Sequence, residues 1–246
     1  MKWGFFTLIH IATLLAAAAM NLGLYYFLKH KSVKVQTLVM LPFSLLGVGA
    51  IIFNLLKWGS PLEYLPLHLC SINAMLLPVV LLTRSKTLGN LLLVWSLGAL
   101  AALVVNTAQA QFEIFSATFC VYYFPHVLEF GIPILLFQLG LIKKDCRCIG
   151  STLAITAGAY TLVHLANLAL NHLCRVWQLL DPAGEVIQVN YMYSLAPENP
   201  LLALFYRLVP HQYWYMYLIV PIVAVYLLGV YAPQLRAALR KRALTV

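Results

Sequence analysis

Seven long apolar runs are the strongest constraint on what this chain can fold into. They cover residues 5–28, 37–57, 62–83, 88–110, 119–142, 149–171 and 213–232. A helix needs about 20 apolar residues to cross the hydrocarbon core of a bilayer. The chain is 63% hydrophobic and 9% charged, whereas a soluble domain is about 45–50% apolar and about 25% charged. The sequence therefore predicts an all-α protein, a single-domain polytopic membrane helix bundle with seven transmembrane helices.

The basic residues predict how this bundle is oriented. Of the 16 Lys and Arg residues, 12 fall in the loops after the first, third and fifth runs and in the C-terminal tail. Short cytoplasmic loops carry an excess of Lys and Arg, so we expect the N-terminus outside and the C-terminus in the cytoplasm. The net charge of +9 then reflects topology, and we expect no nucleic-acid partner.

Two further features bear on processing and on metals. Lysines follow the first run at positions 29, 31 and 34, whereas a signal peptide carries its charge before the apolar region, so we expect a retained first helix. Cys146 and Cys148 form the pattern C-x-C with no nearby histidine, which is too few ligands for a zinc site. We expect no metal and no cofactor.

The one long connection, residues 172–212, is predicted on the outer side. It carries turn signals at 181–184 and 197–200 around a β-prone or extended segment, VIQVNYMYSL. The following segment, 201–209, is apolar and too short to span. We expect it to form a short helix in the membrane interface or over the bundle.

The third run carries polar side chains in its first half, and one of them matches a histidine of the fifth run in depth. Cys70 lies eight residues into the third run and His126 seven residues into the fifth. At 1.5 Å per residue both lie about 10–12 Å below the outer edge. Glu129 shares a helix face with His126 and is predicted to orient its ring by accepting a hydrogen bond. The sequence therefore predicts a catalytic thiol–imidazole pair.

Other polar residues are candidates for substrate binding in the same outer half. They are His68, Asn73, Asn106, His164 and Asn167. Each candidate also has a structural interpretation. A membrane cysteine often serves as a small apolar filler, and buried His, Asn and Glu can form hydrogen bonds between helices. His68 lies two residues before Cys70 and points about 200° away from it on a helix.

Three short blocks resemble a known family. The segment LPLHLCS at 65–71, the histidine of FPHVLEF at 124–130 and the segment NYMY at 190–193 are similar to the YwaF-like family of bacterial integral membrane proteins. That family is related to an animal transmembrane acyltransferase that remodels ether phospholipids. The resemblance implies a cysteine nucleophile at Cys70 and a histidine partner at His126. It also implies an integral protein of the bacterial cytoplasmic membrane.

Three hypotheses for function follow. The first is an acyltransferase or lipase acting on phospholipid acyl esters through Cys70 and His126, with membrane phospholipid as its partner. The second is a small-solute transporter or membrane substrate-binding subunit that uses the same polar pocket. The third, a purely structural membrane protein, leaves the acidic side chain of Glu129 within an apolar helix unexplained.

Overall fold

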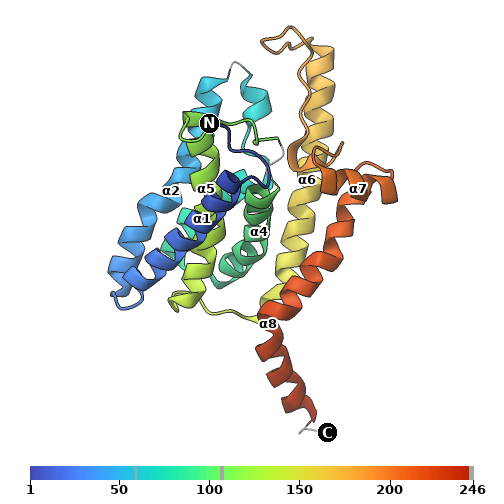
Figure 1. Cartoon of the computed structure of the whole chain (residues 1–246). Helices are drawn as coiled ribbons and strands as arrows, with labels where there is room; N and C mark the ends of the chain where they lie inside the picture. The colour runs from blue at the N-terminus through green and yellow to red at the C-terminus, as the bar shows by residue number, and fades with distance from the viewer. Residues whose placement is uncertain (59, 106–107, 244–246) are drawn as a thin grey trace.

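The computed structural model describes residues 1–58, 60–105 and 108–243, and these ranges form an all-helical bundle (Figure 1). Its α-helices are α1 (Leu8–Leu28), α2 (Val33–Lys57), α3 (Leu69–Thr83), α4 (Lys86–Val104), α5 (Ala117–Gln138), α6 (Ile149–Val176), α7 (Pro200–Leu208) and α8 (Val220–Ala243). Short 3-10 turns occur at η1 (Pro61–Tyr64), η2 (Cys146–Cys148), η3 (Tyr191–Tyr193) and η4 (Trp214–Ile219). Within the described ranges, β pairing is limited to two isolated bridges.

Six of the described helical segments are long and apolar enough to cross a membrane, so the polytopic bundle is supported. The third predicted helix, 62–83, is shorter than expected, because α3 begins only at Leu69 and has 15 residues. At 1.5 Å per residue it is about 22 Å long, less than the bilayer core of about 30 Å. Pro66 disfavours a helical conformation at Leu65, which has a ψ of 143° and separates the turn η1 from α3. A seventh crossing stays a prediction.

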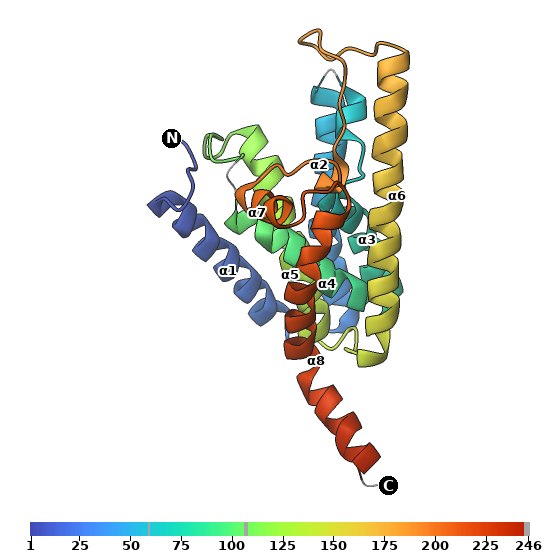
Figure 2. The same ribbon diagram turned by 90° about the vertical axis from the view of Figure 1, so that its right-hand side faces the viewer.

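Boundaries also differ from the prediction in the second half of the chain. α6 continues to Val176, five residues beyond the predicted end at Asn171. The last run begins as the 3-10 turn η4 and continues as α8 to Ala243. The predicted short helix is present as α7, whose first turn is capped by the Asn199 side chain accepting a hydrogen bond from the Leu202 amide at 2.9 Å. Figure 2 shows α6 upright at one side of the bundle and α1 slanting away at the other.

The core is built around α5. Helices α1, α2, α3 and α4 all pack against it. Its Leu128, Ile132 and Leu136 are buried in one apolar cluster with Leu81 of α3 and Leu92 of α4. Because α5 is covered on several sides, polar side chains on it meet other helices and not lipid. It is therefore the element most able to hold reactive groups in a fixed place.

Polar contacts join three segments at the basic end of the bundle. Lys86, at the start of α4, forms an ion pair with Asp145, which also pairs with Arg147 at 3.0 Å. Arg147 and Lys86 donate hydrogen bonds that hold the pKa of the Asp145 carboxyl well below its usual range. Gln234 of α8 accepts a hydrogen bond from the Cys146 amide at 2.8 Å. These contacts connect α4, the loop before α6, and α8.

One close approach fixes α1 against α5. The Asn21 side-chain amide donates hydrogen bonds to the carbonyls of Ala17 at 3.0 Å and of Val127 on α5 at 3.4 Å. It occupies the space beside Gly131 where a Cβ atom would stand. The Tyr123 hydroxyl adds a second contact by donating to the Thr13 carbonyl at 2.6 Å. Glycine at position 131 is therefore required for α1 to lie this close.

We predict that Gly131→Ala destabilises the fold. The added methyl group would overlap the Asn21 amide, and such overpacking costs about 1–3 kcal/mol. The matched control is Gly158→Ala on α6, where the new Cβ meets nothing within 4 Å and removal of a helical glycine gains about 0.5–1 kcal/mol. Thermal unfolding of the purified protein in detergent measures both. Equal midpoints for the two variants would contradict this account of α1 packing.

Candidate functional site

A polar face runs along α5 toward its N-terminal half. Tyr122, His126 and Glu129 are spaced i, i+4 and i+7, which places them on one side of the helix, and His126 and Glu129 are both buried. Nδ1 of His126 lies 2.6 Å from the Tyr122 carbonyl oxygen. A carbonyl can only accept, so Nδ1 carries the hydrogen and donates it. The other ring nitrogen, Nε2, is left with a lone pair that can accept a proton.

Glu129 does not have the predicted contact with His126. The structure gives no hydrogen bond between the two side chains, and the Tyr122 carbonyl orients the ring instead. The carboxyl group points toward α2, because a Cβ placed on Gly47 would lie 3.3 Å from its Oε1. Its Oε2 is buried with no hydrogen-bond partner among the described residues. An unpaired acidic group within a membrane helix indicates a functional role by default.

Cys70 lies in the first turn of α3. Its sulfur is in hydrogen-bonding range of the amide and hydroxyl of Ser71, and the first amides of a helix lack intrahelical partners. The thiol is also within electrostatic range of Glu129 and of Tyr122. Tyr122 and Glu129 precede and follow His126 on α5, and the structure gives no hydrogen bond between the Cys70 sulfur and the His126 ring.

Asn73 is fully buried one turn after Cys70. Neither its amide nitrogen nor its side-chain oxygen has a hydrogen-bond partner among the residues that the structure describes. A buried amide without partners is costly. It is therefore free to bind a polar group of a ligand. Asn106, the other predicted amide of this pocket, lies outside the described residues.

The remaining predicted residues hold residues 189–194 of the long connection after α6, a segment that we call the outer turn after the side on which it is predicted to lie. Asn167 of α6 donates to the Tyr191 carbonyl at 2.8 Å and accepts from the Tyr191 amide at 3.0 Å. His164 and Asn167 both bind the Ser194 hydroxyl. These hydrogen bonds match the structural interpretation of the two residues. Both polar atoms of Asn167 and Nδ1 of His164 are therefore bound by the protein itself.

His68 is also committed to the outer turn. It is the N-cap residue of α3, and its Nδ1 accepts a hydrogen bond from the Met192 amide at 3.3 Å. Its ring lies 5.3 Å from that of Tyr191 and 5.5 Å from that of Tyr193, measured between centroids. The histidine therefore connects the outer turn to the helix that carries Cys70.

Two site residues were missed by the sequence analysis. Tyr122 precedes His126 by four residues, and a backbone carbonyl at that spacing is present in any helix, so the sequence does not single it out as the partner of the ring. Tyr193 reaches the electrostatic range of Cys70 from the outer turn. Met192 and Tyr193 have φ angles of 51° and 55°, which bulky residues rarely adopt. No simple sequence signal marks that conformation, and the segment was expected to be extended.

Asn167→Ala is predicted to loosen the outer turn. The change removes two hydrogen bonds to the Tyr191 backbone and one to Ser194, each worth about 1 kcal/mol, and leaves backbone groups unpaired. We expect roughly tenfold or faster hydrogen exchange at the Tyr191 amide, measured by mass spectrometry. Asn54→Ala in α2, which removes only an exposed contact with Trp58, is the control. Unchanged exchange in Asn167→Ala would contradict the structural role.

No group of three or more His, Cys, Asp or Glu side chains that could hold a metal ion occurs among the described residues.

Comparison with known proteins identifies the family of this chain. No curated protein and no solved structure matches the chain. The TMEM164 family matches residues 5–231, nearly the whole sequence, and covers every helix discussed above as part of the site. The chain therefore belongs to the TMEM164 family.

Proposed function

We propose that this protein is a membrane-embedded enzyme that transfers acyl groups from glycerophospholipid esters through Cys70 and His126. The observation that carries the proposal is the position of the Cys70 thiol, within electrostatic range of the two side chains that flank His126 on α5. A thiol becomes a nucleophile when an adjacent base removes its proton. The Nε2 lone pair of His126 is such a base.

The first half of the reaction forms a thioester. Nε2 takes the thiol proton while the Tyr122 carbonyl holds Nδ1–H and keeps the ring oriented. The sulfur attacks the ester carbonyl, the bond to the glycerol oxygen breaks, and that oxygen leaves with the proton from Nε2 as a lysolipid hydroxyl. In the second half, Nε2 deprotonates an acceptor hydroxyl, whose oxygen attacks the thioester. The proton then returns to the sulfur.

Two sets of donors are candidates for the developing oxyanion. The amides of the first turn of α3 have no intrahelical partners, and the Asn73 amide is buried and unpaired. Preorganised donors of this kind stabilise tetrahedral intermediates of acyl transfer. Glu129 stays in the proposed site with a different role. Its unpaired Oε2 can accept a hydrogen bond from the hydroxyl of the acyl acceptor.

The family resemblance and the position of the thiol support the choice of lipid as substrate. The blocks at 65–71 and 124–130 resemble proteins related to an ether-phospholipid acyltransferase. A thiol in the first turn of α3 also suits esters near the boundary between headgroups and hydrocarbon. If water replaces the lysolipid acceptor, the same residues give a lipase. The test below separates the two reactions by their products.

The solute-binding alternative has weaker support. It needs polar side chains that remain free to bind a solute. Both polar atoms of Asn167 and Nδ1 of His164 are bound by the outer turn, and Nδ1 of His68 is bound to the Met192 amide. Of the predicted substrate-binding residues within the described ranges, Asn73 alone keeps unpaired buried polar atoms.

The topology forms part of the proposal. We place the basic end in the cytoplasm of a bacterial inner membrane, with the N-terminus outside and residues 62–68 completing the seventh crossing with α3. We expect Ser32→Cys to react with a membrane-impermeant maleimide only after cells are opened, and Ala183→Cys in intact cells. Both sites are exposed, and both variants are made with Cys146 and Cys148 replaced by Ser. The reverse pattern would contradict the orientation.

Acylation of Cys70 is the direct test of the mechanism. The protein is incubated in detergent with a phospholipid that carries an alkyne-tagged acyl chain, and intact mass is measured before and after neutral hydroxylamine, which cleaves thioesters. We expect the acyl mass on wild type and on the control Cys120→Ser. Cys70→Ser should lose it, and His126→Ala should acquire it about 10²–10⁴-fold more slowly.

The product of a second incubation identifies the acceptor. Added lysolipid should recover the tag as a diacyl lipid if the enzyme is a transferase, whereas a tagged free fatty acid indicates a lipase. Cys70→Ser labelled as rapidly as wild type would overturn Cys70 as the nucleophile. Labelling of His126→Ala at the wild-type rate would remove the histidine from the mechanism.

A further inference from the structure

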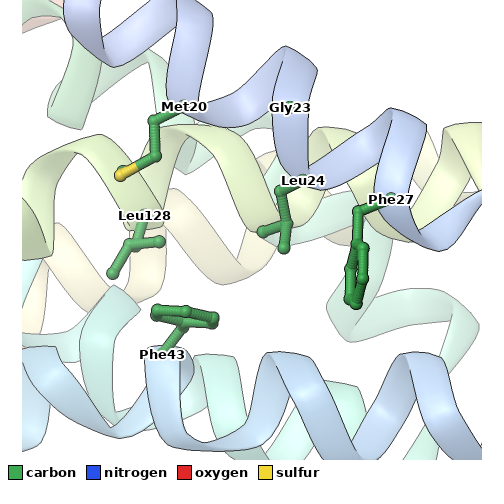
Figure 3. A pocket seen from close by; sticks show the side chains of 6 residues that line it. All are labelled: Met20, Gly23, Leu24, Phe27, Phe43 and Leu128. Carbon is green, nitrogen blue, oxygen red and sulfur yellow. The ribbon is translucent and has the colours of Figure 1, made fainter.

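A groove separates α1 from α2 and has α5 as its floor (Figure 3). Its lining consists of Met20, Gly23, Leu24 and Phe27 of α1, Phe43 of α2 and Leu128 of α5. Its volume is about 270 Å³. The lining side chains are all apolar. Inside a membrane such a groove is filled by hydrocarbon, so its shape alone does not select a ligand.

The groove is open along its length. A Cβ atom added to Gly23 would meet nothing within 4 Å, and Phe27 and Phe43 are both exposed. Leu128 lies two residues from His126, so the two side chains point about 200° apart around α5. The groove therefore lies on a different face of α5 from the proposed catalytic residues. What binds in it is a question separate from the acyl-transfer proposal.

Cations gather where the groove reaches the loop between α1 and α2. The Lys31 ammonium lies 5.7 Å from the centre of the Phe27 ring, which lines the groove, and the Lys29 ammonium lies 4.6 Å from the Tyr26 ring. Arg84 reaches the same end of α2 by donating to the Thr37 hydroxyl at 3.5 Å.

The described ion pairs involve other basic residues than these three. The two ion pairs found in the described part of the chain both use Asp145, with Lys86 and Arg147. Lys29, Lys31 and Arg84 therefore have no acidic partner among the described residues. An apolar groove that ends at uncompensated cations is complementary to a molecule with a hydrocarbon chain and a negative head.

We propose that this groove binds an anionic glycerophospholipid, one acyl chain lying against Phe43 and Leu128 and the phosphate bound by Lys31 and Lys29. Anionic lipid headgroups bind clusters of Lys and Arg next to membrane helices. The hydrocarbon chain fills the gap between α1 and α2. The lipid is a bound partner of the bundle at the basic end, held without any covalent step.

The test is native mass spectrometry of the full-length protein in detergent, titrated with phosphatidylglycerol or with phosphatidylcholine of the same acyl chains. We expect wild type to retain phosphatidylglycerol preferentially. The double variant Lys29→Gln/Lys31→Gln should lose roughly tenfold or more in apparent affinity for phosphatidylglycerol, because each lysine near a headgroup contributes about fivefold. Lys143→Gln/Lys144→Gln, in another basic loop, is the matched control and should keep the preference.

The groove itself is tested by filling it. Gly23→Leu places a side chain in the open space of the groove and should weaken retention of both lipids. Gly158→Leu adds the same side chain at an equally open site on α6 and should not. Phe43→Ala removes the side of the groove that α2 provides and should also weaken retention of both lipids. Equal retention of the two lipids by wild type would overturn the proposal. So would a loss in the control lysine variant as large as that in Lys29→Gln/Lys31→Gln, or unchanged retention in both groove variants.

Discussion

The packing of four helices around α5 is the constraint on which the rest of the structure depends. A bilayer offers no water to polar groups, so each must be placed against protein or be left unsatisfied. α5 carries the imidazole of His126 and the carboxyl group of Glu129. Because α5 is buried among other helices, these two groups lie against protein and not against lipid. Glycines make the close packing possible: Gly47 of α2 leaves room for the Glu129 carboxyl group, and Gly131 of α5 leaves room for Asn21 of α1.

The second organising element is the outer turn. Asn167 and Asn171 of α6 pair with its backbone, the latter donating to the Val189 carbonyl and accepting from the Val189 amide, both at 2.8 Å. On its other side, the Met192 amide of the outer turn donates a hydrogen bond to Nδ1 of His68. α6 packs against α4, and the hydrogen bonds of the outer turn also connect α6 to α3. The position of Cys70 is therefore set from the loop side as well as from the helix side.

Much of the fold could be predicted from the sequence, because bilayer thickness makes the length of apolar runs informative. The start of α3 could not be predicted in this way, because the length of an apolar run contains no information on the backbone restriction that Pro66 imposes. The pairing of Cys70 with His126 stays a prediction, which rests on counting residues along two helices to a similar depth. The partner of the His126 ring could not be predicted, because a backbone carbonyl four residues earlier is available in every helix and competes with any side chain. The hydrogen bonds of Asn167 required the path of a loop, which periodicity cannot give.

The hydrogen bonds of the outer connection divide it into parts with different evolutionary freedom. Between Leu180 and Val186 the chain forms a small reversal closed by one bridge, with Gly184 at a φ of 84° and exposed neighbours. Residues 189–194 are instead fixed at both faces by α6 and His68. Related sequences are thus free to vary in length at 181–185, whereas one inserted residue at 189–194 would shift every later backbone group out of register with Asn167. Length polymorphism among relatives should be confined to the tip of the reversal.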